Sequence, residues 1–343
     1  MNETKNAPEK RTDSGNAFKT FARKYMMLIV LLAMIVFFGA CNRQFLTWDN
    51  LITVTRQVSI IGICATGMMF ALLVGHIDLS IGTTVSFSAV LFATLVTDKP
   101  EYSLLGVVVN PYLAMLIVLI VCAGLGAIKG SLVVETNMPA LIATLAVSTA
   151  LEGVNLLITN AMPISGIPDS IQWLGRGFLF NAIPMPIVIF LAIVLVAGFI
   201  LRFTYIGRYI YATGSNTEAA RLAGLNVKLI KTAAYMVATC LCAVAGFVLV
   251  TRLRTGTHTT GAQYQTQALT ACTVGGISMA GGEGGIYNLI VGIFIIGVLT
   301  NGMTILGISA YWQYVAQGAI LAFSVGMDWY HRTHVKSKLV TSK

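Results

Sequence analysis

The chain has 343 residues, of which 56% are hydrophobic and only 10% are charged, and it carries a net charge of +9. Soluble domains carry about 25% charged residues, so this composition excludes an ordinary soluble domain. Because a helix crosses a bilayer with roughly 20 apolar residues, we predict an all-α polytopic membrane protein. The basic residues are scattered among apolar segments instead of lining a groove with interleaved aromatic residues, so we expect no nucleic-acid partner.

Hydrophobic runs predict about ten membrane-spanning helices in a single domain over residues 25–330. A polar arm, residues 1–24, precedes this domain and lacks the pattern of a cleavable signal. A basic tail, residues 331–343, follows it. The predicted spans are residues 25–41, 58–75, 80–97, 111–134, 138–159, 185–203, 231–251, 266–280, 286–306 and 311–329.

Basic residues outside the predicted spans indicate how the chain is oriented. An even number of crossings places both termini on one side, and the cytoplasmic side carries the excess of lysine and arginine. Arg252 and Arg254 fall on the opposite side and are exceptions to this rule. We therefore predict that both termini are cytoplasmic, together with these residues: Lys19, Arg23, Lys24, Arg202, Arg208, Arg221, Lys228, Lys231, Arg332, Lys336 and Lys338.

The longest charged stretch between the termini covers residues 202–231. Ser215 and Glu218 have the spacing of a capping box, which predicts a short helix beginning there. Gly224 is placed to end this helix in a left-handed conformation, and Asn226 is placed to cap the next one. From composition alone, the stretch is either a docking surface or a solvated loop whose basic residues fix the topology.

Two glycine-containing polar breaks interrupt the apolar sequence, at residues 75–82 and 281–285. Asp78 and Glu283 lie in them as isolated acids, and an acid at membrane depth usually faces a cavity or a partner. Such breaks in corresponding places of two halves, spans two to five and seven to ten, indicate inverted repeats around a pathway. The alternatives are that Asp78 caps a helix and that the glycines permit close packing. We assign these residues to the pathway or its gate: Asp78, Ser80, Gly82, Asn137, Gly281, Gly282 and Glu283.

Catalytic and metal-binding patterns are absent from the sequence. The six cysteines lie in or beside apolar segments without ligand spacing, so we expect no metal site. Residues 124–131 superficially resemble a phosphate loop, but the lysine precedes the final glycine instead of following it. We therefore expect no enzymatic activity and no cofactor bound by the chain itself.

Several motifs resemble one family, the permeases of ABC-type sugar importers that serve ribose, xylose and galactosides. The similarity covers most of residues 50–330. It is densest in the 202–231 stretch and continues in GHIDLSIG at 75–82. The residues that carry it are Gly207, Arg208, Ala212, Gly214, Asn216, residues 218–222, Gly224, Asn226, Val227, residues 77–80, Gly82, residues 141–145, Gly275, Gly276, Gly281, Gly282, Gly284 and residues 311–313.

This resemblance implies a type II-like ABC importer permease in a bacterial plasma (inner) membrane. The 202–231 stretch would be its cytoplasmic coupling segment, which contacts an ATP-binding partner subunit. A second permease copy or homologue would complete the pathway, and a periplasmic or extracellular sugar-binding protein would deliver a monosaccharide or sugar-like solute. The implied coupling residues are Gly214, Asn216, Glu218, Ala219, Ala220, Arg221, Gly224 and Asn226.

The sequence departs from the family pattern at a few positions. His76 replaces a usual small residue, Thr217 stands where proline is common, and Ala146 stands where glycine is common. Residues 265–267 read Gln-Thr-Gln where the family often has Glu-Leu-Asp, so two acids have become amides. These departures leave the identity of the solute open.

The alternative function is a self-sufficient secondary transporter driven by an ion gradient. In that case Asp78, Glu152 and Glu283 would be the coupling acids. It would need no ATP-hydrolysing subunit.

Overall fold

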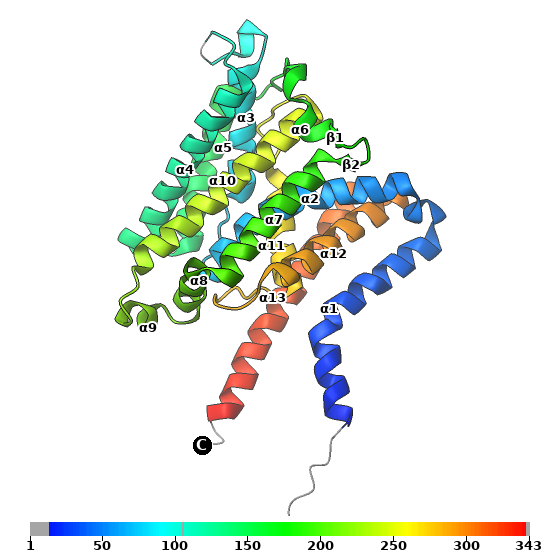
Figure 1. Cartoon of the computed structure of the whole chain (residues 1–343), viewed down its shortest axis with the longest axis vertical. Helices are drawn as coiled ribbons and strands as arrows, with labels where there is room; N and C mark the ends of the chain where they lie inside the picture. The colour runs from blue at the N-terminus through cyan, green and yellow to red at the C-terminus, as the bar shows by residue number, and fades with distance from the viewer. Residues whose placement is uncertain (1–13, 105, 341–343) are drawn as a thin grey trace, which may run out of the picture.

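The computed structural model describes residues 14–104 and 106–340, and the side chains of residues 26–104 and 106–330. The described chain is helical except for one short β-hairpin (Figure 1). Its elements are α1 (Ser14–Cys41), η1 (Arg43–Leu46), α2 (Trp48–Leu73), α3 (Ile81–Val96), η2 (Pro100–Tyr102), α4 (Pro111–Glu135), α5 (Ala140–Thr159), η3 (Asp169–Ile171), α6 (Trp173–Arg176), β1 (Phe178–Leu179), β2 (Ile183–Pro184), α7 (Met185–Phe203), α8 (Tyr205–Ser215), α9 (Thr217–Leu222), α10 (Val227–Leu253), α11 (Ala262–Gly275), α12 (Ile286–Ile305) and α13 (Ala310–Val340).

Six of the described helices are long and apolar enough to cross a membrane: α2, α4, α5, α7, α10 and α12. The prediction of about ten spans is therefore not confirmed. With its 14 residues, α11 is about 21 Å long, and α3 has 16 residues, whereas the hydrocarbon core is about 30 Å thick. Both short helices lie next to one of the two breaks.

Three predicted boundaries differ from those in the structure. Residues 14–24 of the predicted polar arm are helical and belong to α1, while residues 1–13 lie outside the described residues. Helix α2 begins at Trp48, ten residues before the predicted start of its span. The predicted tail is helical through Val340, and residues 341–343 lie outside the described part.

The centre of the bundle is α2, in which every residue from Val58 to Leu73 is buried. A helix that is apolar on all sides belongs in an interior. Helix α10 packs against α2, α3 and α4, and its contact with α4 is close because Gly126 has no side chain. A Cβ at Gly126 would lie only 2.6 Å from Met236 Cα.

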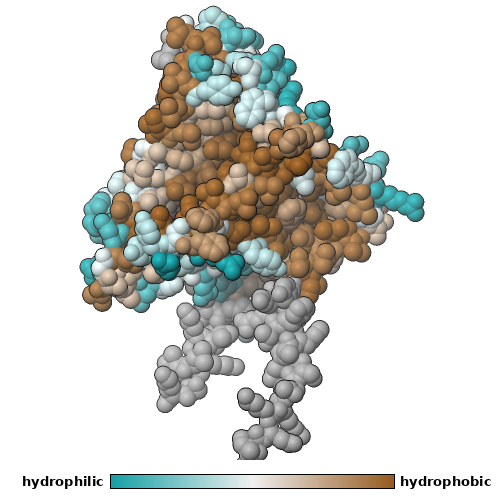
Figure 2. Space-filling model, in the orientation of Figure 1, coloured by the Kyte–Doolittle hydropathy of each residue, from teal (hydrophilic) through white to brown (hydrophobic). Residues whose placement is uncertain are grey.

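The outer helices expose large apolar side chains on α4, α5 and α7. Figure 2 shows a hydrophobic band across the middle of one face, with hydrophilic residues gathered beyond it at the two ends. A soluble protein rarely exposes so much contiguous apolar surface. The chain is therefore a multi-pass helical membrane protein.

The two ends of the bundle carry different elements. Helices α8 and α9 lie at one end, and the first turns of α1 and last turns of α13 extend on the same side (Figure 1). Helix α6 and the β-hairpin lie toward the opposite end (Figure 1). The first break follows α2, the first span of its half, but the second break follows α11, which is the second helix of its half. The inverted repeat therefore stays a prediction.

Candidate coupling and translocation site

The coupling segment folds as two short helices with hydrogen-bonded caps. Asn216 caps α9, because its side-chain oxygen accepts a hydrogen bond from Ala219 N at 3.0 Å. The predicted capping box is wrong, since Ser215 is the last residue of α8 and caps nothing. Asn216 is one of the strongest capping residues, and it places the N-cap of α9 one residue later than predicted.

The end of α9 confirms the predicted turn. Gly224 has φ +83°, its N–H donates to Arg221 O at 3.0 Å, and Leu225 N donates to Ala220 O at 3.1 Å. This pair of bonds is the Schellman pattern, in which the left-handed residue is usually glycine. Asn226 then caps α10 by accepting from Leu229 N at 3.1 Å, also as predicted.

The outer surface of α9 is exposed. Glu218 and Arg221 form an ion pair at 2.7 Å whose side chains are 69% and 68% exposed, and Leu222 is 83% exposed. Ala220, which is also a predicted coupling residue, is buried and therefore faces inward. A mixed charged and apolar surface of this kind is available to a partner.

The inner end of α8 contacts both breaks through the backbone. Gly214 lies against Leu73 O and Gly282 N so closely that any side chain there would overlap them. Gly282 N donates to Leu73 O at 3.0 Å, which joins the second break to the end of α2. A Cβ at Gly281 would lie 2.8 Å from both Gly75 N and Gly214 O. The coupling segment and the two breaks therefore form one junction.

The side chain of Tyr211 adds a further bond to this junction. Its hydroxyl donates to Gly284 O at 2.8 Å. Burial raises the pKa of the Tyr211 phenol above its ordinary value, so the hydroxyl keeps its proton and stays a donor. Glu283, between these glycines, is exposed beside the coupling segment, and its prediction as an isolated acid at membrane depth is not supported by this position.

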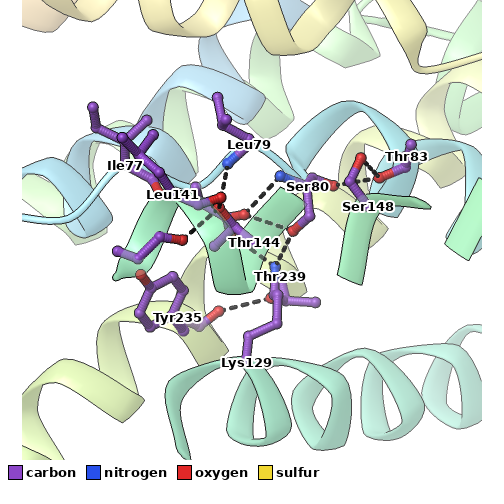
Figure 3. Close-up of polar contacts among 12 residues, drawn as sticks. Ile77, Leu79, Ser80, Thr83, Lys129, Leu141, Thr144, Ser148, Tyr235 and Thr239 are labelled. Atoms are coloured by element: carbon purple, nitrogen blue, oxygen red, sulfur yellow. Dashed lines mark hydrogen bonds and ion pairs between the residues drawn. The ribbon is translucent and has the colours of Figure 1, made fainter. Parts of the chain in front are cut away.

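Asp78 lies deeper and is not isolated. Its Oδ2 lies 2.8 Å from Nζ of Lys129 on α4, and both side chains are buried. Its Oδ1 accepts from the N–H and the hydroxyl of Ser80 at 2.9 and 2.5 Å, and Lys129 also donates to Ser80 Oγ at 2.9 Å. Figure 3 shows Lys129 directed at Ser80 beside the break. Asp78 is not the N-cap of α3, because that position is Ser80.

Helix α5 holds the same break from another side. Thr144 Oγ accepts from Leu79 N at 3.1 Å (Figure 3). The hydroxyls of Thr83 and Ser148 share a hydrogen bond of 3.0 Å, and Asn155 Nδ2 donates to Thr83 O at 3.4 Å. The first break is thus fixed to α4 by charge and to α5 through Thr144, and the first turn of α3 is fixed to α5 through Thr83.

Lys129 is the residue that the sequence motifs missed. It lies in an apolar span, in the stretch that superficially resembles a phosphate loop. A lysine at membrane depth needs a partner, and Asp78 was the available acid in a neighbouring break. The pair could have been found by matching one intramembrane base to one intramembrane acid.

The other predicted pathway residues take no part in the contacts of Asp78 with Lys129 and Ser80. Asn137 is exposed in the α4–α5 turn with φ 54°. Gly82 packs against the backbone of Gly261 at the start of α11, so it serves close packing. Among the residues that the structure describes, no group of three or more His, Cys, Asp or Glu could hold a metal ion.

Comparison with known proteins shows the family. A family model described as "Branched-chain amino acid transport system / permease component" matches residues 50–325. The chain is 35% identical to the ribose import permease protein RbsC of Haemophilus influenzae, over 90% of this chain and 93% of that protein. It is 32% identical to the galactose/methyl galactoside import permease protein MglC of Escherichia coli, over 91% and 96%, and 31% identical to the D-allose transport system permease protein AlsC of Escherichia coli, over 91% and 93%.

A multi-pass helical bundle with these relatives is a transport permease. The chain belongs to this family of transport-system permease components. The resemblance to permeases of ABC sugar importers is thereby confirmed. No solved structure matches the chain.

Proposed function

We propose that the chain is the transmembrane permease subunit of an ABC importer that moves a monosaccharide or sugar-like solute into the cytoplasm. The names of the relatives support a sugar, since they import ribose, galactose or methyl galactoside, and allose. A separate cytoplasmic subunit binds and hydrolyses ATP, and the permease itself holds no cofactor. Two copies, or this chain and a homologue, enclose the pathway.

The observation that carries this proposal is the junction at Gly214. The exposed surface of α9 is where the ATP-binding subunit docks. When that subunit moves α9, the backbone of Gly214 moves with it and displaces Leu73 and Gly282, which lie against it. Nucleotide binding is thereby coupled to the two breaks at the end of the pathway. With α9 in the cytoplasm, both termini are cytoplasmic as well, since α1 begins and α13 ends on the side of α8 and α9 (Figure 1).

The opposite end of the bundle is proposed to receive the sugar-binding protein. Arg176 Nε donates to Arg252 O at 2.9 Å, and Arg254 pairs with Asp169 at 2.7 Å with both side chains largely exposed. These arginines include the two exceptions to the positive-inside pattern. Their position suits docking of an acidic surface, for which complementary charge guides the encounter.

The experiment is a pull-down of the tagged protein from native membranes, with ATPase activity measured on the eluate. The test variant is the double swap Glu218→Arg and Arg221→Glu, which keeps the i,i+3 ion pair of α9 while inverting its charge pattern. The matched control is the swap Asp169→Arg and Arg254→Asp, an exposed pair at the other end.

We expect an ATP-hydrolysing subunit to elute with the wild-type protein and with the control swap but to be lost from the α9 swap. An α9 swap that retains the ATPase would refute docking at α9. A wild-type protein that elutes without ATPase activity and transports under an ion gradient would support a secondary transporter instead.

A further inference from the structure

Helix α5 carries an exposed acid within a membrane span. Glu152 lies 12 residues after Ala140 and 7 residues before Thr159, about 18 Å and about 10 Å from the two ends of the helix. It has no hydrogen-bond or ion-pair partner among the described residues, unlike Asp78 and Lys129, which have each other. Because a carboxylate at such depth is too costly in hydrocarbon, Glu152 must face water or a polar surface in the assembled protein.

Its neighbours show which surface that is. Glu152 lies one turn after Ser148 and one turn before Asn155, on the edge of α5 that packs along α3. Ser148 and Asn155 both bind Thr83 of α3, and the Asn155 side-chain oxygen is buried without a partner in the described part of the chain. The most exposed large apolar residue of α5, Leu157 at 79%, lies on a different side of the helix. Helix α5 thus carries polar groups along the edge that packs on α3, where exposed Leu145 and Leu156 flank Glu152, and it has an apolar outer face around Leu157.

The polar edge continues across α3 to α11. A Cβ at Gly82 on α3 would lie 3.1 Å from Gln265 Cβ on α11, and Gln265 is half-buried. We call the surface formed by five residues of these three helices the polar seam. Its members are Thr83, Ser148, Thr149, Glu152 and Gln265.

We propose that the polar seam is the wall that contacts the solute and that it faces the second permease copy or homologue across a water-filled passage. This inference rests on the proposed function, because it assigns contact residues to the pathway named there. The second copy is the occupant because α5 is an outer helix whose charged edge another polypeptide must shield from lipid.

The chemistry of the seam selects a class of solute. Hydroxyl and amide groups can donate to and accept from the hydroxyl groups of a sugar, and the Glu152 carboxylate accepts only. A neutral polyhydroxylated solute satisfies both kinds of group. An anionic solute, such as a phosphorylated sugar or a sugar acid, is repelled by Glu152, so the residue acts in specificity by exclusion.

The test is thiol reactivity in native membranes, which needs no knowledge of the solute. In a Cys41→Ser background, which removes the exposed native thiol, Glu152→Cys and Leu157→Cys are treated with a membrane-impermeant cationic methanethiosulfonate. We expect Glu152→Cys to react at least about tenfold faster, because it meets water while Leu157→Cys meets lipid. Equal rates at the two positions would overturn the proposal.

A second measurement keeps Glu152 in place. Thr149→Cys introduces a thiol one turn away from Glu152. The ratio of its reaction rates with a cationic and an anionic reagent is measured once with Glu152 intact and once with Glu152→Gln. Neutralising the carboxylate should lower that ratio by about tenfold if residues 149 and 152 share one aqueous passage, and an unchanged ratio would refute the shared passage.

The ATPase pull-down separates the two proposals. If the thiol measurements fail while the ATPase co-elutes with the wild-type protein, only the polar seam is refuted. If the thiols react as expected but no ATPase co-elutes with the wild-type protein, the coupling proposal is refuted.

Discussion

Asp78 and Lys129 are 51 positions apart in sequence, yet the carboxylate and the ammonium group lie 2.8 Å apart with both side chains at most 1% exposed. Ser80 binds both of them, so each charge has more than one partner. The pair ties the first break to the last third of α4. Removing one charge would leave the other buried and unpaired, which costs far more than removing both.

Loss of either charge should therefore destabilise the protein strongly. We expect Asp78→Asn or Lys129→Met alone to lower the free energy of unfolding by about 3–5 kcal/mol, and the double variant to recover most of it. Thermal unfolding in detergent, followed by size-exclusion chromatography, measures the effect. The exposed pair of Glu135 and Lys228 is the control, with an expected change below about 1 kcal/mol. Additive losses in the double variant would contradict this account of the pair.

Two glycines of the coupling segment should respond differently to alanine. Gly214→Ala forces a methyl group into Leu73 O and should separate ATP hydrolysis from uptake, because the junction opens. Gly224→Ala meets no neighbour but has φ +83°, so it should cost only about 1–2 kcal/mol of local stability. The ratio of ATP hydrolysed to solute taken up, measured in proteoliposomes with the partner subunits, distinguishes the two. The same ratio in both variants would argue against the junction as the coupling point.

The cap of α9 gives a third prediction. Asn216→Ala removes the bond to Ala219 N and should weaken α9 by about 1 kcal/mol, whereas Ser215→Ala removes no cap bond. Hydrogen–deuterium exchange of residues 217–222 should speed up in the first variant only. Faster exchange in Ser215→Ala as well would mean that Ser215 also stabilises α9.

The arginines at the far end predict salt-sensitive docking. Arg252→Glu and Arg254→Glu should slow association with the sugar-binding protein, and the deficit should shrink as salt is added because exposed charges are screened. Surface plasmon resonance on the complex in nanodiscs measures the association rate. Lys228→Glu, which changes an exposed cation within the coupling segment at the other end of the bundle, should leave that rate unchanged. An association rate that does not depend on salt would exclude this face.

Local signals in the sequence predicted local structure well. Gly224 and Asn226 were identified correctly because a left-handed helix end and a side-chain cap depend on residues within one turn. The start of α2 was missed because Asn50 and Gln57 lower its hydropathy. In the structure these amides bond to Asn301 and Thr300 of α12, which lie far away in sequence. Only the tertiary fold supplies those partners.

The candidate site divides in the same way. The family resemblance identified the coupling segment, whereas the pairing of Asp78 with Lys129 and the exposure of Glu283 depend on how helices pack. A sequence lists the charges in apolar segments but not the depth or the direction of each. For this reason Glu283 was grouped with Asp78, although only Asp78 is buried.

The contact of Gly214 with Leu73 and Gly282 has a mechanical consequence. Side chains can rotate away from an approaching neighbour, but backbone atoms in contact have no such freedom. A movement of Gly214 is therefore transmitted directly to Leu73 and Gly282. Since Gly282 is also bonded to Leu73, neither break can shift against α8 without the other. A push of even a fraction of an ångström at α8 therefore reaches both breaks at the same moment, and the two breaks respond to a single event at one end of the pathway.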